Sequence, residues 1–270
     1  MVLRIRPYIL AGGKSSRMGR DKAMLELEGK TLLARAVDTL RSARGLQSED
    51  GRVEVTICGE RDALEGADRA ILDRYPSCGP LGGIEAALND LATRDDADWA
   101  FFIPVDMPLL SEALIEQLLA AWVIEFSKSE SLGACLVEVE GRPQPLVSLI
   151  HRSALELVRE ALLAGRYKVV SVLQSIGACC ALFDQELLSQ DQATVSSSTP
   201  IRVVNSLGFQ WASLIRIHLG VASEDAVQNE CSFRECREQF INVNTEADLI
   251  KVATLLRHKG SNNQPEPLAR

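Results

Sequence analysis

The chain has 270 residues, of which 46% are hydrophobic and 5% aromatic, and its formal net charge is −8 at pH 7. This length is enough for one large α/β domain with a substantial core, and the acidic balance argues against non-specific binding to nucleic acid. No stretch approaches the ~20 uninterrupted apolar residues that span a bilayer. The apolar run near the start is short and interrupted by Arg4 and Arg6, unlike a secretory leader. We therefore expect a cytoplasmic protein without a membrane segment.

The cysteines also indicate a reducing compartment. There are seven, an odd number scattered along the chain, so a disulfide framework is not expected. Cys179 with Cys180, or Cys231 with Cys236, could in principle gather around zinc, but neither pair has Cys-x-x-Cys spacing. Small, partly buried side chains are the favoured interpretation, and the sequence leaves metal binding by cysteine open.

The first predicted strand, residues 6–10, leads into a glycine pair followed by two cations. Gly12 and Gly13 lack a Cβ, so the backbone can adopt positive φ and bring its N–H groups against an anion. Arg17 and Lys22 then place a guanidinium and an ammonium within reach. The spacing matches neither the Walker A loop nor Gly-x-Gly-x-x-Gly. We expect a polyphosphate site of another kind; the alternative is an ordinary glycine turn with solvated cations.

Helical and strand patterns then alternate along the chain, which predicts an α/β fold with a mostly parallel central sheet flanked by helices. Further strands are expected at residues 53–59, 70–73, 99–105, 132–139 and 145–150, with a turn at 141–143. Helices are expected at residues 30–43, 80–91, 112–126, 154–164, 171–176 and 246–257.

The most apolar of these strands, residues 99–105, ends directly before Asp106. Ligands of open α/β sheets bind outside the carboxyl ends of the strands, so Asp106 points to the same crevice as Gly12 and Lys22. Magnesium is usually held by a carboxylate together with phosphate oxygens and waters, and Asp106 is the predicted Mg²⁺ ligand. The alternative is a helix cap, but Ser111 is better placed to cap the next helix.

A second glycine-rich turn follows Asp73. Pro80 suits a first helical turn, and Gly82 and Gly83 allow close approach of the backbone at the start of that helix. This helix start is a second candidate ligand contact; the alternative is a plain glycine-rich connection.

Two amides lie near the end of the chain. Asn242 and Asn244 are two residues apart on a predicted strand, so they face the same side and can address one ligand or ion together. Satisfaction of nearby backbone groups is the alternative. His151 is given no chemistry, because a lone histidine here is more often a helix-start residue.

These motifs closely resemble the molybdenum cofactor guanylyltransferases, which have a Rossmann-like nucleotidyltransferase fold. The resemblance covers residues 6–176 and 240–257. Sister enzymes that transfer CMP usually have Leu-Ala-Ala-Gly at the opening, so Gly12 leans toward the guanylyl branch. The family commonly has Thr-Pro-Glu-Asp where this chain has Thr245-Glu246-Ala247-Asp248. The motifs that carry the resemblance are Leu10-Ala11-Gly12-Gly13, Arg17-Met18-Gly19, Asp21-Lys22-Ala23, Gly79-Pro80-Leu81-Gly82-Gly83-Ile84, Asp106-Met107-Pro108 and Asn242-Val243-Asn244.

The resemblance implies transfer of GMP from GTP to the terminal phosphate of molybdopterin carrying molybdenum, with release of pyrophosphate and formation of the guanine dinucleotide cofactor. Expected partners are GTP, the molybdenum cofactor and, transiently, cofactor-synthesis proteins or molybdoenzymes. The implied nucleotide-binding residues are Leu10, Ala11, Gly12, Gly13, Lys22, Asp73 and Asp106. The implied catalytic residues are Arg17, Lys22 and Asp106, the metal ligand is Asp106, and the acceptor-binding residues are Gly82, Asn242 and Asn244.

Two other functions remain open at this point. One is a related nucleotidyltransferase that uses CTP or a different phosphorylated acceptor, and the other is a noncatalytic nucleotide- or cofactor-binding protein. We expect one nucleotidyltransferase domain over residues 1–258, with an insertion at about 179–239 before the last helix. Within the insertion, residues 193–199 are predicted as a surface loop and 211–221 as a helix. Residues 259–270 are predicted as a disordered tail.

Overall fold

The structure is a computed structural model that describes residues 4–12, 21–48, 50–128, 133–139, 142–176, 178–183, 201–205, 213–215 and 237–262. Several sequence-based predictions fall outside these ranges, namely Gly13, Arg17, Cys231, Cys236, the loop at 193–199 and the end of the tail at 263–270.

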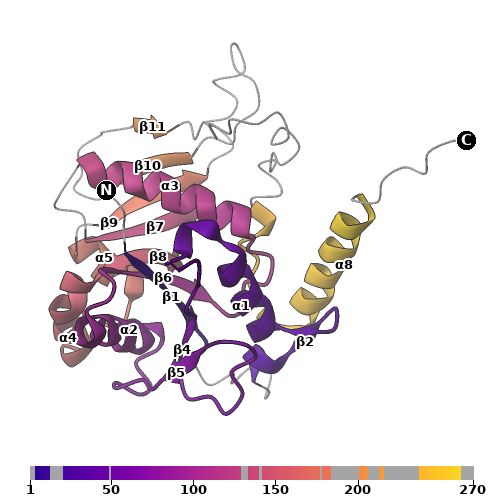
Figure 1. Cartoon of the computed structure of the whole chain (residues 1–270), viewed down its shortest axis with the longest axis horizontal. Helices are drawn as coiled ribbons and strands as arrows, with labels where there is room; N and C mark the ends of the chain where they lie inside the picture. Colours follow the sequence, from indigo (N-terminus) through magenta and orange to yellow (C-terminus); the bar gives the residue numbers. More distant parts are fainter. Residues whose placement is uncertain are drawn as a thin grey trace, which may run out of the picture.

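The described strands form a nine-stranded sheet with the order β11-β10-β9-β7-β8-β6-β1-β4-β5 (Figure 1). Strands β5, β4, β1 and β6 are parallel, as are β7 and β9, whereas β8 and β10 are antiparallel to their neighbours. A separate hairpin is made by β2 (Glu26–Leu27) and β3 (Lys30–Thr31). The sheet strands are β1 (Ile5–Leu10), β4 (Thr56–Cys58), β5 (Arg69–Ile71), β6 (Trp99–Pro104), β7 (Ala134–Val139), β8 (Arg142–His151), β9 (Ala178–Phe183), β10 (Ile201–Asn205) and β11 (Ser213–Ile215).

Helices cover both faces of the sheet. Helices α1, α3 and α8 contribute to one hydrophobic cluster and α2, α4 and α5 to the other, and Figure 1 shows these two groups on opposite sides of the strands. This arrangement confirms the predicted α/β class with a mostly parallel central sheet. The helices are α1 (Leu32–Ser42), α2 (Pro80–Arg94), α3 (Glu112–Lys128), α4 (Leu155–Leu163), α5 (Val169–Ser175) and α8 (Glu246–Asn262), and the 3-10 helices are η1 (Lys22–Met24), η2 (Arg44–Leu46) and η3 (Arg152–Ala154). No described helix is long and apolar enough to cross a membrane.

Strand β6 shows why its sequence is almost continuously apolar. Every residue of the strand is buried, because successive side chains point to opposite faces and helices cover both. Phe101 packs near Trp122 of α3, with ring centroids 6.2 Å apart. On the other face, Phe102 stacks on Tyr8 of β1 at 5.7 Å. The central strand is thereby fixed, and so is the position of the residues that follow it.

Side-chain caps define where several helices begin. Ser111 Oγ accepts a hydrogen bond from Leu114 N at 3.2 Å, as predicted for the start of α3. At α8, Thr245 Oγ1 accepts from Asp248 N at 3.2 Å, and the Asp248 carboxylate accepts from Thr245 N at 2.8 Å. This reciprocal cap starts α8 at Glu246 without the proline that the family commonly has there. His151 lies at the N-terminal cap of η3, as expected for a helix-start residue.

Local predictions were wrong at four places, apart from shifts of up to three residues in the ends of other elements. Residues 142–143 belong to β8 rather than to a turn, because Arg142 pairs with Val139 across the hairpin. Residues 213–215 form β11 rather than part of a helix, because they pair with β10, and short apolar runs do not distinguish the two structures. Residues 241–244 are irregular rather than a strand. Residues 259–262 continue α8 rather than beginning a tail.

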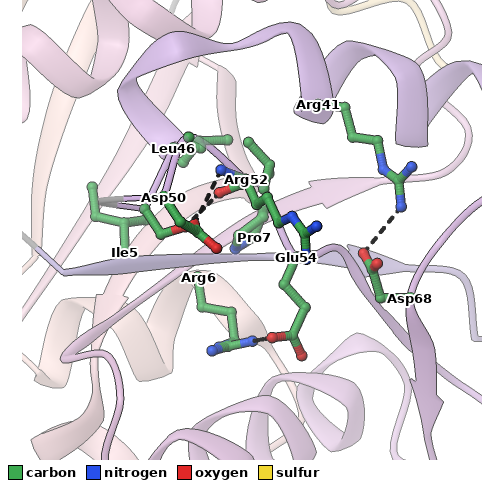
Figure 2. A pocket seen from close by; sticks show the side chains of 12 residues that line it. Ile5, Arg6, Pro7, Arg41, Leu46, Asp50, Arg52, Glu54 and Asp68 are labelled. Carbon is green, nitrogen blue, oxygen red and sulfur yellow. Dashed lines mark hydrogen bonds and ion pairs between the residues drawn. The ribbon is translucent and has the colours of Figure 1, made fainter.

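A cavity of about 670 Å³ lies at the starts of β1, β4 and β5, where Ile5–Pro7, Glu54 and Asp68 line it (Figure 2). Its walls are joined by ion pairs, including Arg6 with Glu54 at 2.6 Å and Arg41 with Asp68 at 3.1 Å. Ligands of such sheets bind at the opposite edge, where parallel strands end. We therefore place the candidate functional site elsewhere.

Candidate functional site

Strands β1 and β6 bring the two main predicted motifs together. Leu10 pairs with Pro104, and Val105 N continues the ladder with a 3.2 Å hydrogen bond to Leu10 O. The chain therefore leaves both strands at one edge of the sheet, with Ala11 and Gly12 after one and Asp106 after the other. Ala11 N is held in turn by Cys58 O of β4 at 3.2 Å. The predicted convergence of Gly12 and Asp106 at one edge is confirmed.

Lys22 joins this edge from η1. Its Nζ donates a hydrogen bond to Asn244 Oδ1 at 2.7 Å and lies 3.5 Å from Asp106 Oδ2. The side chains of Lys22 and Asp106 are 22% and 23% exposed. Asp21 positions the lysine, because its Oδ1 accepts from Ala23 N and caps η1. A cation, a carboxylate and an amide from three distant segments thus meet in a partly buried site.

Burial raises the pKa of Asp106 from its ordinary value, and the nearby Lys22 ammonium opposes that rise. Desolvation disfavours the charged carboxylate, and one cation at 3.5 Å does not fully compensate. The site therefore favours additional positive charge beside Asp106.

The segment that carries the two asparagines is fixed by hydrogen bonds to the loop after β6. Val243 N donates to Asp106 O at 2.8 Å, and Gln239 Oε1 accepts from Ser111 N at 2.9 Å. Asn242 Oδ1 is buried and has no hydrogen-bond partner among the described residues. The predicted pairing of both amides on a strand face is replaced by an irregular segment in which Asn244 contacts Lys22.

Asp73 and Gly82 lie together near the start of α2, which is the second candidate ligand contact. Asp73 Oδ1 accepts from Tyr75 N at 2.8 Å, and a Cβ added to Gly82 would lie 2.4 Å from the same oxygen. Only glycine leaves room for this carboxylate without a shift. Burial is the largest cause that raises the pKa of Asp73, and the negative charge of Glu85 raises it further.

The opening motif has a geometry that differs in part from the prediction. Leu10 and Ala11 are buried, so their side chains belong to the core. Gly12 is exposed and is not among the residues with positive φ, whereas Gly59 has a φ of 128°. A Cβ on Gly59 would lie 3.3 Å from Gly12 N. The close approach at this edge therefore needs Gly59, which the sequence reasoning missed.

Sequence reasoning also missed Arg61. Its Nη1 donates to the Asp21 carboxylate and its Nη2 to the Ala11 carbonyl, so it joins both sides of the opening motif. A signal was present, since Arg61 follows the carboxyl end of β4, at the edge where ligands gather.

No group of three or more His, Cys, Asp or Glu side chains among the described residues could hold a metal ion. Among those residues, Asp106 has no neighbouring His, Cys, Asp or Glu side chains that could complete a metal site made of protein ligands alone. A single carboxylate is nevertheless sufficient for magnesium when substrate phosphates and waters complete the shell.

Solved structures share the fold of this chain. The crystal structure of molybdopterin-guanine dinucleotide biosynthesis protein A from Archaeoglobus fulgidus is similar, with a TM-score of 0.58 at 16% identity over 94% of this chain and 99% of that one. A 4-diphosphocytidyl-2C-methyl-D-erythritol synthase from Anaerococcus prevotii gives 0.52 at 11% identity, with 94% and 96% covered. This chain therefore has the fold of both proteins.

Sequence comparison specifies the family. A family model described as the MobA-like NTP transferase domain matches residues 8–179, and the chain belongs to that family. A molybdenum cofactor guanylyltransferase from Photobacterium profundum is 31% identical over 196 residues, which are 71% of this chain and 90% of that protein. Another from Xanthomonas euvesicatoria is 43% identical over 118 residues, which span 43% of this chain and 55% of the relative.

Proposed function

We propose that this protein transfers GMP from GTP to the terminal phosphate of molybdopterin carrying molybdenum, releasing pyrophosphate. The observation that carries the proposal is the meeting of Lys22, Asp106 and Asn244 at the carboxyl ends of β1 and β6. The guanylyltransferase relatives support the choice of nucleotide and acceptor. The reaction is assigned to the cytoplasm, with transient contact to cofactor-synthesis proteins or molybdoenzymes.

The chemistry requires alignment and charge neutralisation more than proton transfer. A phosphate monoester has its second pKa near 6, so the acceptor is largely dianionic at neutral pH and needs no general base. The Lys22 ammonium neutralises charge on the triphosphate. Its hydrogen bond to Asn244 holds it beside Asp106. Backbone N–H groups at the opening motif add donors for the phosphates, and Arg17 adds a guanidinium.

The residues present fit a magnesium ion. Asp106 would hold it, because its carboxylate is desolvated and incompletely balanced by Lys22. The buried Asn242 Oδ1, which has no partner within the described part of the chain, is a further oxygen of the kind that magnesium accepts. When bound, the ion stabilises negative charge that develops on the transferring phosphoryl group.

Asp73 is the proposed guanine contact. A carboxylate can accept hydrogen bonds from both the N1–H and the exocyclic amine of guanine, whereas cytosine offers a different edge. One oxygen already accepts from Tyr75 N, but a carboxylate has acceptor capacity for additional bonds. Gly82 lacks a Cβ and thereby leaves the space that this carboxylate occupies.

The proposal is tested by pyrophosphate release with GTP, CTP, ATP and UTP, each with Mg²⁺ and molybdopterin loaded with molybdenum. We expect turnover with GTP that requires both the metal and the acceptor. Faster turnover with CTP would assign the protein to the cytidylyl branch. No turnover with any nucleotide, in protein that binds GTP, would indicate a noncatalytic binding protein.

A further inference from the structure

Arg61 occupies an unusual place beside the proposed nucleotide site. It lies three residues after β4 ends at Cys58, and its guanidinium donates to the Asp21 carboxylate and the Ala11 carbonyl. These two acceptors are ten positions apart in the sequence. A single side chain therefore joins the end of the β1 segment to the start of η1.

The bond to Asp21 continues to Lys22 through η1. While Asp21 Oδ2 accepts from Arg61, Asp21 Oδ1 accepts from Ala23 N at 3.1 Å and caps the 3-10 helix. Lys22 is the first residue of that helix, and its ammonium contacts Asp106 and Asn244. A change in the position of Asp21 would thus move Lys22 relative to the Asp106 carboxylate.

Burial and geometry distinguish Arg61 from a surface ion pair. Its side chain is 13% exposed, whereas that of Asp21 is 43% exposed. An ion pair with one partner this exposed contributes little to stability, because solvent screens the attraction between the two charges. The planar guanidinium can donate to two acceptors in fixed directions, which a lysine ammonium on a flexible stem does not reproduce. The contact is better suited to fixing geometry than to adding stability.

We propose that Arg61 is a positioning residue that fixes Ala11 and Asp21 relative to each other and thereby places Lys22 opposite Asp106. Its effect on turnover rests on the proposed nucleotidyl transfer, whereas its effect on η1 does not. Arg61 needs no contact with substrate in this role.

The test compares Arg61→Gln and Arg61→Lys with Arg69→Gln. Arg69 is a matched control, because it also contacts two partners, Glu54 and Asp90, but lies at the start of β5. The backbone amide of Ala23 donates to Asp21 Oδ1, and that of Leu25 donates to Lys22 O. Hydrogen exchange at these two amides reports the order of η1 without any nucleotide. We expect exchange there to accelerate about 10-fold or more in both Arg61 variants and to match the wild type in Arg69→Gln.

Turnover provides the second measurement. With GTP, kcat/KM should fall about 10- to 100-fold in Arg61→Gln, with no such fall in Arg69→Gln at a comparable loss of thermal stability. Arg61→Lys should not restore kcat/KM, because lysine keeps the positive charge but lacks the planar guanidinium that donates to two acceptors. Full recovery in Arg61→Lys, or unchanged exchange at Ala23 and Leu25 in a folded Arg61→Gln protein, would overturn the proposal.

Asp21→Asn provides a route if the buried arginine cannot be replaced without unfolding. Asparagine can still cap η1 through its Oδ1, but it removes the charge that Arg61 contacts, so the same acceleration of exchange is expected. Wild-type protein that turns over no nucleotide would contradict the proposed function, and the exchange measurement would still decide whether Arg61 positions η1.

Discussion

Lys22 donates a 2.7 Å hydrogen bond to Asn244, although the two residues are 222 positions apart. The site near the start of the chain is therefore completed by a segment near its end. That segment is held by Val243 and Gln239, which bond the loop after β6. Both parts of the chain must be folded together before Lys22 has its observed environment.

Replacement of Lys22 by alanine should weaken triphosphate binding. A hydrogen bond to a charged group contributes about 1.5–3 kcal/mol, which corresponds to a loss of roughly 10- to 100-fold in GTP affinity. Isothermal titration calorimetry with GTP and Mg²⁺ measures the change in affinity. Lys30→Ala is the control, since that lysine is 59% exposed and pairs with Asp38. Equal affinities for the two variants would remove Lys22 from the phosphate site.

Asp106→Asn should suppress turnover far more than GTP binding. The amide keeps the size of the side chain but loses the charge that the proposed metal site requires, so we expect kcat to fall roughly 100- to 1,000-fold. Steady-state pyrophosphate release gives kcat, and direct titration gives the affinity. Asp38→Asn serves as the exposed control. Normal kcat in Asp106→Asn would exclude the metal role.

Gly82→Ala tests the contact at the start of α2. The added methyl would lie 2.4 Å from Asp73 Oδ1, so the carboxylate or the helix must shift, at a cost of about 1–3 kcal/mol in the free energy of unfolding. Urea denaturation measures this loss. In an Asp73→Ala background, the same substitution should cost clearly less, because the obstructing oxygens are gone. Additive effects of the two changes would show that they do not contact each other.

Two aspartates should respond to pH with opposite signs. The pKa of Asp73 is raised, so its contribution to stability is present below the ordinary aspartate pKa and is lost as pH rises through the folded value. Asp73→Asn should therefore raise Tm near pH 7. This gain should disappear as the pH is lowered to about 3.9.

Asp248 is the comparison. Hydrogen bonds from the Thr245 hydroxyl, and from the backbone N–H groups of Asn244 and Thr245, lower the pKa of Asp248. Its contribution to stability is therefore present above the ordinary aspartate pKa and is lost as pH falls. Asp248→Asn should lower Tm near pH 7, with the difference shrinking in acid. Thermal scans of both variants across this range check the signs. A shift of the same sign in both would contradict the assigned environments.

The sequence predicted the elements whose local pattern agrees with their tertiary position. Strand β6 is apolar throughout because both faces are covered, and Ser111 is a cap in pattern and in structure. Gly12 and Asp106 were predictable because each lies two residues after the end of a strand, and the ends of parallel strands share one edge. In these places, local chemistry and the global fold give the same answer.

Where contacts between distant segments decide the structure, the sequence was insufficient. Residues 241–244 alternate in polarity like a strand, but a hydrogen bond to Asp106 O and the Gln239 contact hold them in an irregular path. The place of Arg61 after β4 was a signal, but its contacts were not predictable, since its two acceptors become neighbours only after folding. The strand β11 exists because β10 offers it a partner.

The sheet extends past the region that the family model matches. Strand β9 pairs with every residue of β7 from Ala134 to Val139, yet the family match ends at residue 179, inside β9. A protein shortened at that point would expose the backbone hydrogen-bonding groups along one side of β7. Unpaired edge strands of this kind pair with other chains and cause aggregation. We therefore expect the later strands to limit aggregation, and trimmed versions intended for expression should retain them.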